Sequence, residues 1–90
     1  MLEKVRTALR IKTRSLDNEI EDLIAAALAD LKIAGVRNTD ENDPLIIRAV
    51  ITYCKANFGV TDAYDRLKKS YDEQKAQLQM AYGFTDWGDE

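Results

Sequence analysis

Hydrophobic residues recur at helical spacing in four separate stretches of the chain. The clearest stretch covers about residues 16–34, and its apolar positions fall on one face of a helix. These positions are Leu16, Ile20, Leu23, Ala27 and Leu31. Ser15 precedes the stretch and is the predicted N-cap, because its hydroxyl can accept from a free backbone N–H. Gly35 follows it and can take the left-handed conformation that ends a helix.

A shorter stretch at the start of the chain predicts a helix over about residues 2–9. Leu2, Val5 and Leu9 share one face of this segment. A helix of about two turns is not stable alone in water. We therefore expect it to dock on the longer helices.

The third stretch, about residues 44–57, is apolar on most sides. Asp43 is its predicted N-cap and Pro44 its first helical residue, where the missing N–H costs nothing. Its β-branched pairs, Ile46-Ile47 and Val50-Ile51, also suit a strand. The proline start, the length and the stop at Gly59 favour a helix, and its composition places it in the middle of a core.

The fourth stretch covers about residues 63–82, with Thr61 or Asp62 as the predicted cap. Its apolar positions are Tyr64, Leu67, Tyr71, Leu78 and Tyr82. Glutamines dominate its second half, which predicts that the helix extends beyond its own core. Together the pattern predicts an all-α bundle of four helices in one domain, residues 1–82, followed by a flexible C-terminal tail, residues 83–90.

Composition limits the classes of protein to consider. Ninety residues fit one domain, and contents of 46% hydrophobic and 32% charged residues are typical of a folded soluble protein. The single cysteine, Cys54, fits a reducing cytoplasm. The sequence contains no apolar run of membrane-spanning length. We also expect no secretory signal, because no apolar region follows the charged first residues. The net charge of −3 argues against a dedicated nucleic-acid binder.

The sequence offers little reactive chemistry. It has no histidine, which removes the commonest general base and metal ligand. Cys54 lies in the most apolar stretch, where it is interpreted as a small core side chain. Asp40, Glu41 and Asp43 lack the spacing of a calcium loop, and the glycines are too far apart for a phosphate loop. We therefore expect no enzymatic activity, no cofactor and no metal site.

Two sets of residues are candidates for contact with partners. Arg6, Arg10 and Arg14 are spaced by four, so they share one face if the helix continues that far. One alternative is that this face contacts DNA phosphates or an acidic protein surface. The other is that it is a solvated face with ordinary ion pairs such as Glu3–Arg6.

The second set is aromatic and lies near the C-terminus. Tyr82, Phe84 and Trp87, with Leu78 before them, lie at or beyond the end of the last apolar face. Aromatic residues in such positions often anchor interfaces. The alternative is that the tail folds back onto its own bundle, and the sequence leaves both alternatives open.

Three stretches of the sequence resemble one family. They are Leu16–Val36, Asp43–Gly59 and the segment with Tyr64-Asp65-Arg66-Leu67 and Ser70-Tyr71. They are similar in order and spacing to the helices of the head-tail connector proteins of tailed siphophages, also called DNA-packaging or head-completion adaptors. The resemblance extends up to about Leu78.

This resemblance implies a structural subunit of the virion, made in the bacterial host cytoplasm. It implies a homo-oligomeric ring, a dodecamer in the virion, that docks beneath the portal protein. The ring contacts the tail-proximal head-completion or tail protein, and double-stranded DNA passes through it without sequence-specific contact. It implies no catalytic residues. The competing interpretations are a small helical DNA-binding regulator and a helical protein-binding regulator of prophage origin.

Overall fold

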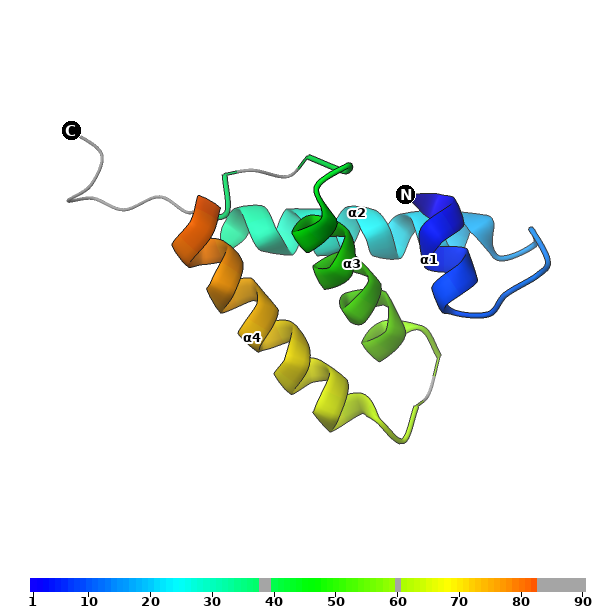
Figure 1. Cartoon of the computed structure of the whole chain (residues 1–90). Coiled ribbons are helices and arrows are strands. Elements are labelled where there is room, and N and C mark those ends of the chain that lie inside the picture. The colour runs from blue at the N-terminus through cyan, green and yellow to red at the C-terminus, as the bar shows by residue number, and fades with distance from the viewer. Residues whose placement is uncertain (38–39, 60, 83–90) are drawn as a thin grey trace.

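In the computed structural model, residues 1–37, 40–59 and 61–82 are described, and this part of the chain is helical (Figure 1). Its elements are α1 (Leu2–Ala8), α2 (Asp17–Ile33), α3 (Pro44–Asn57) and α4 (Tyr64–Tyr82). The predicted all-α fold is confirmed, and the predicted ends agree with the observed ones to within one residue. None of these helices is long and apolar enough to cross a membrane.

The central position predicted for α3 is confirmed, because α3 packs against each of the other three helices. Ile46, Ala49, Val50 and Cys54 of α3 have no exposed surface. All four helices contribute to one core. Its remaining buried residues are Val5, Ile20, Ile24, Ala27, Leu31, Val36, Tyr71 and Leu78.

The first two helices end in the same way. At the end of α2, the Gly35 N–H donates to the Lys32 carbonyl and the Val36 N–H to the Leu31 carbonyl. Gly35 has a φ of 94°, as this left-handed helix ending requires. At the end of α1 the same pair of bonds is present, from Arg10 to Thr7 and from Ile11 to Arg6.

Arg10 therefore occupies the position that glycine usually takes. Its φ is 61°, and it is the only residue other than glycine with a positive φ in the described part of the chain. A Cβ atom makes this conformation unfavourable by about 1 kcal/mol. The chain thus carries a long charged side chain at a place where its own backbone favours glycine.

The N-cap residue predicted from the sequence is the observed one for α3 but not for α2. The Asp43 side chain accepts from the Leu45 N–H at 2.8 Å, so the predicted cap of α3 is confirmed. The prediction for Ser15 was wrong, because Leu16 is the N-cap of α2 and no side chain caps it. The Ser15 hydroxyl instead bonds Thr13 across 3.2 Å in the preceding turn. Before α4, the Thr61 hydroxyl accepts from the Ala63 N–H.

The second half of α4 remains in contact with the core. Leu78 is 2% exposed and belongs to the core cluster. The Gln79 side-chain amide donates to the Ala34 carbonyl at 2.7 Å, which holds the C-terminal ends of α2 and α4 together (Figure 1). The expectation that the helix leaves its core was therefore wrong for Leu78, whereas Gln79 is exposed and reaches the end of α2.

Candidate functional site

The basic residues near the N-terminus do not share one helical face. The helix ends at Ala8, so Arg10 and Arg14 lie in the following turn and loop. Arg6 is the most enclosed, with a side chain 12% exposed that lies 3.0 Å from Glu3 and 3.4 Å from Asp17. Its charge is therefore compensated within the chain.

Arg14 turns back toward the same two carboxylates. Its guanidinium lies 3.6 Å from Glu3 and 3.9 Å from Asp17, and its side chain remains 71% exposed. Arg10 is exposed and has no ion pair within the described residues. Of the three predicted contact residues, Arg10 and Arg14 are accessible to a partner, whereas Arg6 holds the start of α2 against α1.

The predicted interface residues near the C-terminus lie partly in α4 and partly beyond its end. Leu78 is 2% exposed and belongs to the core cluster, so it offers almost no surface to a partner and is removed from the candidate interface set. Tyr82 is the last residue of α4, and its side chain lies outside the described part. Phe84 and Trp87 lie outside the described residues.

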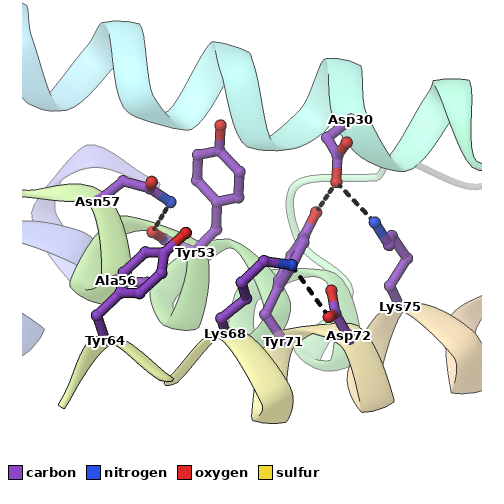
Figure 2. Close-up of a pocket in the computed structure, with 9 residues that line it drawn as sticks. All are labelled: Asp30, Tyr53, Ala56, Asn57, Tyr64, Lys68, Tyr71, Asp72 and Lys75. Carbon is purple, nitrogen blue, oxygen red and sulfur yellow. Dashed lines mark hydrogen bonds and ion pairs between the residues drawn. The ribbon is translucent and has the colours of Figure 1, made fainter. Parts of the chain in front are cut away.

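A polar pocket of about 180 Å³ lies where α2, α3 and α4 meet (Figure 2). Asp30 of α2 points toward α4 and accepts from the Tyr71 hydroxyl at 2.7 Å and from the Lys75 ammonium at 3.2 Å. The Lys75 ammonium also lies 5.2 Å from the centre of the Tyr71 ring. Tyr53 of α3 meets Tyr71 edge to face, with ring centres 5.3 Å apart. Contacts between the aromatic and charged side chains that line the pocket thus connect the three helices.

These contacts shift the protonation equilibria inside the pocket. The hydrogen bond from Tyr71, which outweighs the opposing effect of burial, keeps the pKa of Asp30 below its ordinary value. Burial and the bond to Asp30 raise the pKa of Tyr71. Burial also raises the pKa of Tyr53. At neutral pH, Asp30 is therefore a carboxylate and Tyr71 and Tyr53 are neutral phenols, and the bond between Asp30 and Tyr71 stabilises both of these states.

Cys54 lies in an environment that does not favour reaction. Cys54 is a free thiol with no exposed surface, and burial raises its pKa to about 11. A nucleophilic cysteine needs a low pKa and access. Within the described residues, no cluster of three or more histidine, cysteine, aspartate or glutamate side chains can hold a metal ion. The arrangement of these described side chains suits packing between helices.

The sequence did not indicate the Asp30–Tyr71–Lys75 contact. Tyr71 was assigned to the core face of its helix, but its hydroxyl partner lies 41 residues away. A buried tyrosine usually needs such a partner, so the burial of Tyr71 was the available signal. Which residue accepts from it depends on how α2 and α4 are placed in the fold.

Comparison with known proteins identifies the family. A sequence profile of the family described as "Phage connector protein" matches residues 1–85. The chain belongs to this phage connector family. The match covers all four helices, so the resemblance to head-tail connectors seen in the sequence is confirmed. No curated protein and no solved structure gave a significant match.

Membership of the phage connector family gives the chain a general role. The family is structural and non-enzymatic, and its members are components of the virion that assemble with phage head and tail proteins. The exposed, charged outer surface of the connector bundle suits such contacts. Its function therefore has to be sought on its surfaces.

Proposed function

We propose that this connector is a head-completion adaptor that forms a ring beneath the portal and joins the capsid to the tail around the DNA channel. The observation that carries the proposal is the family match over residues 1–85. The twelve-fold symmetry typical of portals makes a dodecamer the expected ring in the virion. The partners are the portal protein on one side and the tail-proximal head-completion or tail protein on the other.

The position of Arg10 supports contact with DNA or an acidic partner. Its side chain is exposed while its backbone is in a conformation that favours glycine. Unfavourable backbone conformations that persist are commonly associated with function. Arg10 and Arg14 are therefore the proposed contacts to phosphates in the channel or to carboxylates of a neighbour, without reading of base sequence.

The aromatic C-terminus is the proposed contact with a neighbouring subunit or the portal. Tyr82, Phe84 and Trp87 supply the large side chains that anchor interfaces. Residues 1–82 then form the assembly domain and residues 83–90 its extension. Cutting the chain after Met80 is expected to leave helicity unchanged by circular dichroism and to abolish ring assembly on the portal. Rings that still form with the shortened chain would contradict this role.

A nonsense codon in the gene tests the adaptor function directly. In the phage that encodes this connector, the mutant is expected to package DNA but to leave heads and tails unjoined in electron micrographs. A plasmid copy of the connector is expected to restore joined particles. Normal tailed particles made by the mutant alone would refute the proposal.

A plasmid copy carrying Lys55→Glu is the matched control for charge changes made elsewhere. Lys55 is exposed on α3 and belongs to neither candidate contact set. This variant is expected to rescue the nonsense mutant as the wild type does. Variants at Arg10 or Arg14 are expected to rescue it less well.

A further inference from the structure

The long helix α2 has two distinct faces. Its core face carries the buried residues Ile20, Ile24, Ala27 and Leu31. The opposite face consists of exposed residues, which we call the α2 outer face: Glu19, Asp22, Ala26, Ala29 and Ile33. Ile33 is 85% exposed, so its apolar side chain is available to a partner. Along the helix, this face begins with two acidic residues, continues with two alanines and ends with the large apolar Ile33.

Helix α4 has a similar exposed face on the side away from its buried residues. We call it the α4 outer face: Arg66, Lys69, Glu73, Ala76 and Met80. Met80 is 81% exposed. This face is basic first, then carries one acidic residue, and ends in a small and a large apolar residue. The five charged side chains of the two outer faces have no ion pair or hydrogen bond within the described part of the chain.

The two faces have the same spacing. Steps of three, four, three and four residues separate their five positions in both helices. This is the spacing that places residues along one straight seam between two packed helices. When the seams are aligned in parallel, Glu19 meets Arg66 and Asp22 meets Lys69. Further along, Ala26 meets Glu73, Ala29 meets Ala76 and Ile33 meets Met80.

We propose that the α2 outer face of one subunit packs in parallel on the α4 outer face of the next copy of this chain. The inference rests on the proposed function and specifies the contact between neighbouring subunits. Two opposite-charge pairs form at one end, and two apolar side chains that are exposed in the single chain are covered at the other. Between them, the small side chains of Ala29 and Ala76 allow the helices to approach closely.

The charges also select against the other arrangements of these faces. An antiparallel pairing of α2 with α4 forms no opposite-charge pair and places all five charged side chains against apolar residues, Glu19 against Met80 and Arg66 against Ile33 among them. In the parallel pairing only Glu73 faces an apolar residue, the small Ala26. A parallel pairing of two α2 helices places acidic residues against each other. The favoured contact joins two different faces, so it repeats from subunit to subunit and can close into a ring.

The seam is short, which suits ordered assembly. Each face extends over 15 residues, or about 21 Å from the first to the last position. A single contact of this length is weak, whereas in a closed ring every subunit makes it twice. Subunits therefore remain separate in dilute solution and join when the portal gathers them.

Exchanging the charges across the seam tests the contact in the phage. Rescue of the nonsense mutant is measured with plasmid copies carrying Glu19→Lys with Asp22→Lys, or Arg66→Glu with Lys69→Glu. We expect each double variant to weaken subunit association by roughly 100-fold, because like charges then oppose each other. The variant with all four changes restores opposite pairs and is expected to regain most of the rescue.

A matched control separates the seam from net charge. Glu21→Lys with Glu41→Lys makes the same change in net charge as Glu19→Lys with Asp22→Lys. Its positions are exposed and lie outside the α2 outer face. This control is expected to rescue normally. Failure of the four-fold variant to rescue better than the double variants, with circular dichroism unchanged, would overturn the contact. In that case the wild-type plasmid would still rescue, so the adaptor function would stand.

Disulfide capture gives a second test in assembled particles. Ala29→Cys and Ala76→Cys in one chain, oxidised by air with a copper catalyst, are expected to give a ladder of linked subunits on a non-reducing gel. Each single variant is the control and is expected to remain monomeric, because Cys54 is buried. Dimers of the Ala29→Cys variant alone, or no ladder from the double variant, would refute the proposed pairing.

Discussion

Asp30 joins α2 to α4 through two donors on the facing helix. Its carboxylate accepts from Tyr71 and Lys75, which lie 41 and 45 residues further along the chain. A hydrogen bond to a charged acceptor is stronger than one between neutral groups. Asp30 therefore links two helices that are far apart in the sequence.

Removing the Tyr71 hydroxyl tests how much this bond contributes. Tyr71→Phe is expected to lower the free energy of unfolding by about 1 kcal/mol, since the ring stays packed and only one hydrogen bond is lost. Urea denaturation followed by circular dichroism measures it. Tyr64→Phe is the control, because Tyr64 is 42% exposed, and it is expected to change little. Equal effects of the two changes would contradict the role of the bond.

The lowered pKa of Asp30 predicts a pH dependence. Because the folded-state pKa lies below the unfolded one, the carboxylate stabilises the fold above about pH 4. This stabilisation is lost as the pH falls through the folded-state pKa. Asp30→Asn is therefore expected to be less stable than the wild type at pH 7, with a difference that shrinks below pH 4. A difference that stays constant with pH would count against the assignment.

Cys54 provides a probe of the folded state. With no exposed surface and a pKa of about 11, the thiol is expected not to react with a disulfide reagent at pH 8. Addition of urea is expected to make it reactive over the same range as the loss of helicity. Rapid reaction without urea would show that α3 is not enclosed as described.

The ends of the helices were largely predictable, because the signals that set them are local. Pro44 after Asp43 and Gly35 after α2 act within a few residues, and the structure confirms both. Ser15 has the right residue type for a cap, but Thr13 two residues before it engages its hydroxyl. Residue type alone does not show whether the Ser15 hydroxyl bonds a backbone N–H of the next helix or the neighbouring Thr13 side chain.

A pair of cap substitutions tests this distinction. Asp43→Ala is expected to lower the free energy of unfolding by about 1 kcal/mol, because the Leu45 N–H loses its acceptor. Ser15→Ala is expected to change it by less than about 0.5 kcal/mol, since this residue caps no helix. Thermal unfolding of both variants beside the wild type measures the difference. Equal losses would contradict the observed helix starts.

At the scale of the whole molecule, the sequence determined the fold class but not the contacts between helices. The periodicity of apolar residues identified the helices, and the apolar composition of α3 placed it at the centre. It did not show that Leu78 lies in the core or that Gln79 reaches Ala34, because both depend on how α4 lies against α2. The periodicity also did not show that two apolar residues of the outer faces, Ile33 and Met80, stay exposed.

The bond between Gln79 and Ala34 has a mechanical consequence. It links the last turn of α4 to the end of α2 across 45 residues of sequence. A pull applied to the C-terminal end therefore acts on both helices together, instead of peeling α4 away from the bundle one turn at a time. A subunit held by that end under internal pressure from packed DNA would share the load across its two longest helices.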